Sequence, residues 1–206
     1  MLRIILYILV ILAVIGGAIA GFHQYRVARY NQKDLSAFAG DQIPYTGKLG
    51  KVLVVYYSLT GHTQNIAEQI AHFTGGDLYR IQTQETFKLG PAFYAQVKKQ
   101  LKTREYPALA ENAPDMSAYD VIFVGAPIWW YTAATPVWQF WQEADFKGKK
   151  VVPFSTQGSN YGSYFEDFKK QAQNAQVLES AAFNNVGDKY RQAETNKLIS
   201  WLNGLK

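Results

Sequence analysis

Hydroxyl residues and a glycine gather at one point of the sequence, in the segment SLTGHTQN (Ser58–Asn65). The segment follows the apolar run KVLVVYY and leads into IAEQIAHF, which has the spacing of a helix. A helix N-terminus offers unpaired N–H groups and a partial positive charge, which suit an anion. Ser58, Thr60 and Thr63 can add hydroxyl donors, and Gly61 allows close approach of the backbone. The segment therefore predicts an anion site, although hydroxyl residues also commonly cap helices.

The same segment argues against the best-known phosphate-binding enzymes. A nucleoside-triphosphate hydrolase carries a lysine in its phosphate loop and a nearby carboxylate for magnesium, and this segment has neither. A single terminal phosphate held by neutral donors fits the residues better. Cysteine is absent, which excludes disulfides, thiolate catalysis and iron–sulfur sites. The three histidines lie too far apart in the sequence for metal-ligand spacing, so no metal is expected.

Aromatic residues dominate a second segment, PIWWYTAATP (Pro127–Pro136). Neighbouring side chains in an extended chain point in opposite directions, so these rings cannot all enter one core. At least one ring is expected to be exposed, where it could stack on a planar conjugated ligand. At least one of Trp129 and Trp130 is expected instead to seal the sheet against a helix.

A third segment, STQGSNYG (Ser155–Gly162), contributes glycine amides and one more ring, Tyr161. A phosphate cradle beside two segments that carry aromatic rings describes a site for a mononucleotide with a large flat ring. FMN is the economical candidate for that nucleotide.

These three segments need a scaffold that brings them together. From Lys51 onward, apolar runs alternate five times with helical patterns, which predicts an α/β fold with a parallel sheet and helices on both faces. Ligands of such a sheet bind beyond the carboxyl ends of the strands, where all three segments lie. The expected strands are 51–57, 75–82, 119–127, 149–158 and 175–183, and the expected helices follow them at 66–73, 91–103, from about 136, 164–172 and 189–202.

The motifs YYSLTGHTQNIA, DVIFVGAPIWWYTAATPV and VVPFSTQGSNYG resemble, in this order and spacing, the three flavin loops of the flavodoxin-like family. The similarity covers about Lys51–Lys206 and resembles the short-chain branch. The resemblance implies a three-layer sandwich, with a five-stranded parallel sheet in the order 2-1-3-4-5, that binds FMN. The chain departs from the family in its net charge of +5, where familiar soluble members are acidic, and in its apolar N-terminus.

The resemblance also implies roles for the residues of the three loops. The first loop would hold the FMN phosphate, the second would line the isoalloxazine ring and ribityl chain, and the third would contact the ring's other edge or face. No catalytic residue is implied. His62 has two interpretations, a phosphate contact or proton donor to reduced flavin, and a solvent-facing loop residue. The implied contacts are Ser58, Thr60, Gly61, His62, Thr63, Gln64, Pro127, Ile128, Trp129, Trp130, Tyr131, Ser155, Thr156, Gln157, Gly158, Tyr161 and Gly162.

The first 22 residues predict a transmembrane anchor. The chain is uncharged from Ile4 through Phe22, about the 20 residues that span a bilayer. A cleaved signal peptide is the alternative, because Ala18-Ile19-Ala20 has the small residues of a cleavage site. Basic residues are denser after the segment than before it, which favours a cytoplasmic C-terminal side. Residues 23–50 are expected to form a short juxtamembrane helix and a linker, and residues 51–206 the FMN-binding domain.

The expected function is that of a membrane-tethered electron carrier. Reduced flavin would pass electrons to a redox partner protein or a small acceptor such as a quinone, and the tether would raise its effective concentration. Two alternatives stay open: an oxidoreductase that oxidises NAD(P)H directly to reduce a quinone, and an anchored binding or scaffold protein that has lost the flavin. The basic residues are scattered along the chain, so no nucleic-acid partner is expected.

Overall fold

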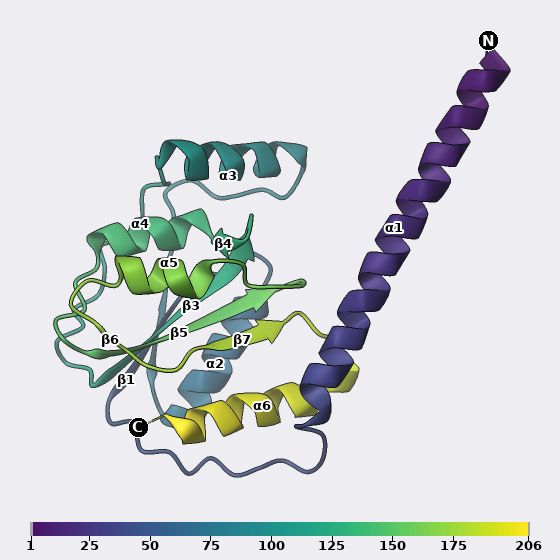
Figure 1. Ribbon diagram of the computed structural model, residues 1–206. Coiled ribbons are helices and arrows are strands. Elements are labelled where there is room, and N and C mark those ends of the chain that lie inside the picture. The colour runs from purple at the N-terminus through teal and green to yellow at the C-terminus, as the bar shows by residue number, and fades with distance from the viewer. Residues whose placement is uncertain (1, 206) are drawn as a thin grey trace.

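A parallel sheet forms the centre of the domain in the computed structural model, which describes residues 2–205 (Figure 1). Met1 and Lys206, at the ends of the expected anchor and domain, lie outside the described residues. The strands lie in the order β2-β1-β3-β5-β6, which confirms the expected order 2-1-3-4-5. Their bounds are β1 (Val52–Tyr56), β2 (Asp77–Arg80), β3 (Val121–Trp129), β5 (Lys150–Gln157) and β6 (Gln176–Val177).

The fifth strand position is divided between two short strands, where one continuous strand was expected. After β6, a second strand, β7 (Ala181–Asn184), also pairs with β5 in parallel. The Val151 carbonyl accepts a hydrogen bond from the Leu178 N–H, so Val151 faces this neighbour. Pro153 is two residues further along, so it faces the same neighbour and has no N–H to contribute. The ladder is therefore interrupted opposite Pro153.

Helices cover both faces of the sheet, as the alternating pattern predicts (Figure 1). Alternate residues of each central strand enter separate cores, so β1, the first part of β3 and the middle of β5 are continuously apolar. On one face, Leu53 and Val55 pack with the helices labelled α3 to α5, and on the other, Val52 and Val54 pack with α2 and α6. These helices are α2 (His62–Thr74), α3 (Pro91–Thr103), α4 (Thr135–Glu143), α5 (Tyr164–Gln171) and α6 (Arg191–Gly204), with a short 3-10 helix, η1 (Asp188–Tyr190), before the last.

The N-terminal helix, α1 (Leu2–Ser36), rises away from the domain as one uninterrupted rod (Figure 1). The juxtamembrane helix expected after residue 22 is its direct continuation, because residues 22–36 contain neither glycine nor proline. The most apolar 18-residue window of this helix has a mean hydropathy of 2.8, and none of it is buried. In the described part of the chain, α1 is the one helix long and apolar enough to cross a membrane.

The segment between α1 and β1 is packed along α6. The Asn196 side chain donates hydrogen bonds of 3.0 Å to the carbonyls of both Phe38 and Asp41. The Asn203 side-chain oxygen accepts a hydrogen bond of 2.8 Å from the Thr46 N–H. Leu49 is buried in the core that α2 and α6 share. Residues 37–50 are therefore fixed to the domain by specific contacts.

Candidate cofactor-binding site

The first loop joins β1 to α2 and turns sharply at Gly61. Gly61 has φ of 95°, a left-handed conformation that favours glycine, and its N–H donates a 3.1 Å hydrogen bond to the Ser58 hydroxyl. The Ser58 hydroxyl therefore stabilises the turn of the loop through a bond within the loop. No described side chain caps α2. The first N–H groups of the helix thus remain available to an anion, while Thr60 and His62 are exposed beside them.

A buried hydroxyl pair joins the first loop to the third. The Thr63 and Thr156 Oγ1 atoms lie 2.8 Å apart, and both side chains are almost fully buried. Thr63 begins the buried face of α2, and Thr156 lies near the end of β5, so the bond fixes the helix against the sheet edge. Because a hydroxyl can donate one bond while accepting others, each group retains capacity for a further partner.

A cavity of about 210 Å³ opens beside the amino end of α2. Thr60, Gly61, His62 and Thr156 from the sequence prediction line one side of it. The other side is formed by residues that the prediction missed, namely Asn184–Asp188, Arg191 and Glu194. The signal for Asn184–Asp188 was present in the sequence. The polar stretch NNVGD follows the fifth strand, so it lies at the same carboxyl edge as the three predicted loops.

The charges around this cavity nearly balance. Arg191 forms an ion pair with Asp188. Burial raises the pKa of Glu194 to about 7, an effect that Lys197 and Arg191 partly oppose. The Glu194 carboxyl consequently carries only part of its negative charge at neutral pH, and it repels an anion less than a fully ionised carboxylate would.

The second loop is a two-residue hairpin turn between β3 and the short strand β4 (Thr132–Ala133). Its central residues, Trp130 and Tyr131, have φ of 50° and 64°. Residues other than glycine rarely adopt this backbone conformation, which costs about 1–3 kcal/mol for each residue. Both residues are exposed, with 46% and 65% of their surface areas accessible. The turn therefore holds two aromatic side chains outward at a cost in backbone strain.

The two tryptophans point in opposite directions, as the alternation of side chains predicts. Trp129 points inward and forms edge-to-face contacts with Tyr57, Phe87 and Phe93, with ring centroids 5.6, 5.2 and 4.8 Å away. Trp130 points outward, and its indole N–H donates a 3.2 Å hydrogen bond to the Tyr94 carbonyl. Trp129 therefore serves the core, and Trp130 is the tryptophan available to a ligand.

The third loop packs directly on the second. Gly162 lies so close to the hairpin that an added Cβ would meet the Tyr131 carbonyl oxygen at 1.9 Å. The Ser163 N–H donates a 2.7 Å hydrogen bond to the same carbonyl. Tyr161 is exposed beside this contact, with its ring 4.9 Å from that of Phe165. The two aromatic loops are therefore positioned by each other as well as by the sheet.

Hydrogen-bonded side chains connect the start of the third loop to α1. The Ser155 hydroxyl donates to Gln157 at 2.9 Å, and the Gln157 amide donates to Asn184 at 2.9 Å. The Asn184 amide in turn donates to the Asn31 side-chain oxygen at 2.7 Å. All four side chains are buried. The sequence contained no signal for Asn31, a polar residue in the segment expected to form a short juxtamembrane helix and a linker.

The predicted contacts thus meet at the carboxyl edge of β1, β3 and β5, although they play different parts there. Ser155, Thr156 and Gln157 are buried framework residues, and Gln64 is engaged with Glu68 along α2 at 2.8 Å. Within residues 2–205, no group of three or more His, Cys, Asp or Glu side chains could hold a metal ion. The predicted residues left exposed for a ligand are Thr60, Gly61, His62, Trp130, Tyr131, Gly158, Tyr161 and Gly162, with Pro127 and Ile128 half-buried between them.

Comparison with known proteins places this arrangement among flavoproteins. A family described as flavodoxin matches residues 51–203. A candidate flavoprotein of Bacteroides eggerthii DSM 20697 is 28% identical, with a TM-score of 0.62 over 75% of this chain and 96% of that one. A second, from Bacteroides uniformis ATCC 8492, is 26% identical, with a TM-score of 0.62 over 75% of this chain and 99% of that one.

A structure of a Lactobacillus acidophilus NCFM flavoprotein in complex with FMN shares the fold. It is 24% identical, with a TM-score of 0.59 over 65% of this chain and 93% of that one. A search of curated proteins gives no match.

Proposed function

The chain belongs to the flavodoxin family over residues 51–203, and we propose that it is an FMN-binding electron carrier tethered to a membrane by α1. Two observations support FMN as the cofactor: the family itself, and the shared fold of a flavoprotein solved with FMN. The bound cofactor supplies the redox chemistry, by accepting and releasing electrons at its isoalloxazine ring.

The residues of the site fit the two ends of FMN. For the phosphate, the amino end of α2 offers its uncapped N–H groups, with the Thr60 hydroxyl at the adjoining cavity. For the flat ring, Trp130, Tyr131 and Tyr161 are exposed on two loops that touch each other. The observation that carries the proposal is this combination of an anion-binding helix end and outward-facing rings at one sheet edge.

The chain's own groups would bind and orient the cofactor. Thr63 and Thr156 hold the phosphate loop against β5, so the N–H donors keep their direction without reorganising when a ligand arrives. The strained Trp130–Tyr131 turn and Gly162 set the spacing between the two aromatic loops. The Tyr57 ring lies against Trp129 beneath the second loop, and burial raises the pKa of Tyr57 to about 12, so it stays neutral.

The length and exposure of α1 support the proposed membrane tethering. An apolar helix of this kind has no partner in water, and its first 22 residues are enough to cross a bilayer. The basic residues Arg26, Arg29 and Lys33 follow the apolar segment and favour a cytoplasmic domain. A carrier held at the surface would meet membrane-bound acceptors at high effective concentration.

The test is a visible absorption spectrum of the full-length chain, purified in detergent and titrated with FMN. Flavin bands with stoichiometric uptake are expected, and the flavin should then be reducible by dithionite and reoxidised by an added electron acceptor. A preparation that binds no FMN would contradict the carrier role and favour an anchored binding protein. Steady oxidation of NAD(P)H without a partner protein would instead favour the oxidoreductase alternative.

A further inference from the structure

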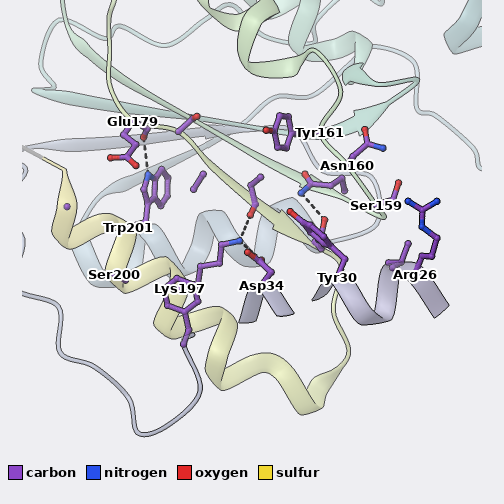
Figure 2. Close-up of a pocket in the computed structure, with 18 of the residues that line it drawn as sticks. Arg26, Tyr30, Asp34, Ser159, Asn160, Tyr161, Glu179, Lys197, Ser200 and Trp201 are labelled. Atoms are coloured by element: carbon purple, nitrogen blue, oxygen red, sulfur yellow. Dashed lines mark hydrogen bonds and ion pairs between the residues drawn. The ribbon is translucent and has the colours of Figure 1, made fainter. Parts of the chain in front are cut away.

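A second and larger cavity, of about 890 Å³, lies between α1 and the domain. Figure 2 shows residues from its walls: α1 with Arg26, Tyr30 and Asp34, α6 with Lys197 and Trp201, the segment before β7 with Glu179, and the loop after β5. That loop is the third loop of the candidate flavin site, represented here by Ser159, Asn160 and Tyr161. The cavity therefore joins the anchor helix to the proposed flavin site.

The residues that line the cavity follow the chain from Phe38 and Asp34 back along α1 toward the apolar N-terminal segment. Near Asp34, α1 is joined to the domain, because the Asn184 amide donates a hydrogen bond to Asn31 and Lys197 forms an ion pair with Asp34 at 2.6 Å. From there α1 leans away from the domain (Figure 1). The lining continues along one side of α1 to His23, which directly follows the uncharged run that ends at Phe22. With α1 in a bilayer, the end of the cavity at His23 would lie at the membrane surface.

The lining suits a neutral, flat and hydrogen-bonding group. Two cationic side chains, Arg26 and Lys197, are balanced by the carboxylates of Asp34 and Glu179. An anionic lipid head group would favour a site with net positive charge, and these four groups supply none. Tyr30, Tyr161 and Trp201 contribute ring surfaces, while Ser159, Asn160 and the Arg26 guanidinium can donate hydrogen bonds to carbonyl oxygens.

We propose that this cavity binds the head group of a lipid-soluble quinone, which enters from the bilayer along α1. The proposal rests on the proposed function, because it identifies the acceptor of the flavin's electrons. A quinone head is a neutral ring with carbonyl acceptors, and its apolar tail would remain in the membrane. Reduction to the quinol takes two electrons and two protons, which fully reduced FMN supplies as it is oxidised. Tyr161 lines the cavity and belongs to the third loop of the proposed flavin site, so the two sites share this residue.

The test uses the full-length chain in lipid nanodiscs without added FMN, so that binding is measured apart from turnover. A photoreactive quinone with an isoprenoid tail is irradiated with the protein, and the labelled peptides are identified by mass spectrometry. Label is expected in residues 23–34, 159–161 or 197–204, and an excess of unlabelled quinone should remove it. Label confined to residues 4–22, or label that excess quinone does not reduce, would overturn the proposal.

A pair of neighbouring substitutions on α1 provides the control. Val27 lines the cavity, so Val27→Trp should fill it and remove most of the specific label. Ala28 is exposed and is not among the lining residues, so Ala28→Trp should label like the unmodified protein. Equal labelling of the two variants would count against the cavity as the binding site. So would protection by anionic phospholipid in place of quinone.

An FMN titration of the same preparation separates this inference from the proposed function. FMN uptake together with specific label supports both. FMN uptake without specific label overturns the quinone site and leaves the carrier role. Specific label without FMN uptake overturns the carrier role while the binding site stands.

Discussion

Asn184 donates a hydrogen bond of 2.7 Å to Asn31, although the two residues are 153 positions apart in the sequence. Asn31 belongs to the long apolar helix α1 and Asn184 ends β7, so the bond connects α1 with the fifth strand position. Asn184 also accepts from Gln157 at the end of β5. The helix α1 is thereby part of the hydrogen-bonded framework beneath the third loop of the candidate site.

Replacing Asn31 should therefore affect a site that it does not touch. Asn31→Ala leaves the buried Asn184 amide without its acceptor, which should lower the free energy of unfolding by about 1–3 kcal/mol. The loosened Gln157 should raise the Kd for FMN several-fold. Fluorescence titration of the full-length protein in detergent measures this change. Gln32→Ala, at an exposed neighbour, is the control and should leave the Kd unchanged. Equal Kd values for both variants would show that the anchor is only a tether.

Thr63→Val tests the hydroxyl pair at the phosphate loop. The substitution keeps the shape of the side chain and removes the partner of the Thr156 hydroxyl. If the Thr63 hydroxyl also contacts the phosphate, FMN binding should weaken by about 1.5–3 kcal/mol, roughly ten- to a hundredfold in Kd. Thr63→Ser retains the hydroxyl and should bind nearly as the unmodified protein does. An unchanged Kd for the valine variant would mean that the phosphate lies elsewhere.

Alanine substitutions at two glycines of the third loop should have opposite effects on FMN binding. In Gly162→Ala the new methyl group would collide with the Tyr131 carbonyl at 1.9 Å, and the backbone φ of 56° adds strain. The two aromatic loops should separate, and FMN uptake should be lost while the far-ultraviolet circular dichroism stays that of an α/β protein. Gly158→Ala meets no described atom within 4 Å, so it should bind FMN normally. If both variants bind equally well, the contact between the loops is not needed.

The raised pKa of Glu194 predicts a particular dependence of stability on pH. Burial holds this pKa at about 7, above the ordinary value of 4.5, so the folded protein retains a proton that the unfolded chain loses across this interval. The free energy of unfolding should therefore fall as pH rises from 4.5 to 7, by at most about 3 kcal/mol, and stay low above pH 7.

Glu194→Gln removes this titration. The free energy of unfolding of the variant, minus that of the unmodified protein, should therefore be larger at pH 8 than at pH 5. Urea unfolding at the two values, followed by tryptophan fluorescence, gives the comparison. Glu166→Gln, at an exposed carboxyl on α5, controls for the loss of one charge. Parallel stability curves for Glu194→Gln and the unmodified protein would contradict the prediction.

Most helices and strands could be predicted from local sequence patterns. The apolar run before Ser58, the glycine pair at 75–76 and the proline at 91 define elements by short-range chemistry, and the structure has those elements close to the expected bounds. The split of the fifth strand depends on Pro153 in a neighbouring strand, which no single segment reveals. To predict this break, one would need to know which residues of the fifth strand pair with Pro153, as well as that residue 153 is a proline.

The candidate site shows the same division. Loop residues rich in hydroxyl groups and aromatic rings could be recognised from the sequence, because they follow strands at a known edge. Asn31 and Arg191 could not, because their relation to the site depends on how distant helices pack against that edge. Long-range contacts made by ordinary polar residues leave no local pattern.

The unbroken course of α1 also limits how the domain can move. Residues 23–36 extend the helix by about 20 Å beyond the apolar segment, and they are joined to the domain by a buried hydrogen bond and an ion pair. A carrier on a slack tether could tumble and visit partners in any direction. The proposed carrier would instead turn together with α1 as one rigid unit, at a constant height above the bilayer and with one side facing it. Its search for partners then becomes lateral diffusion in two dimensions.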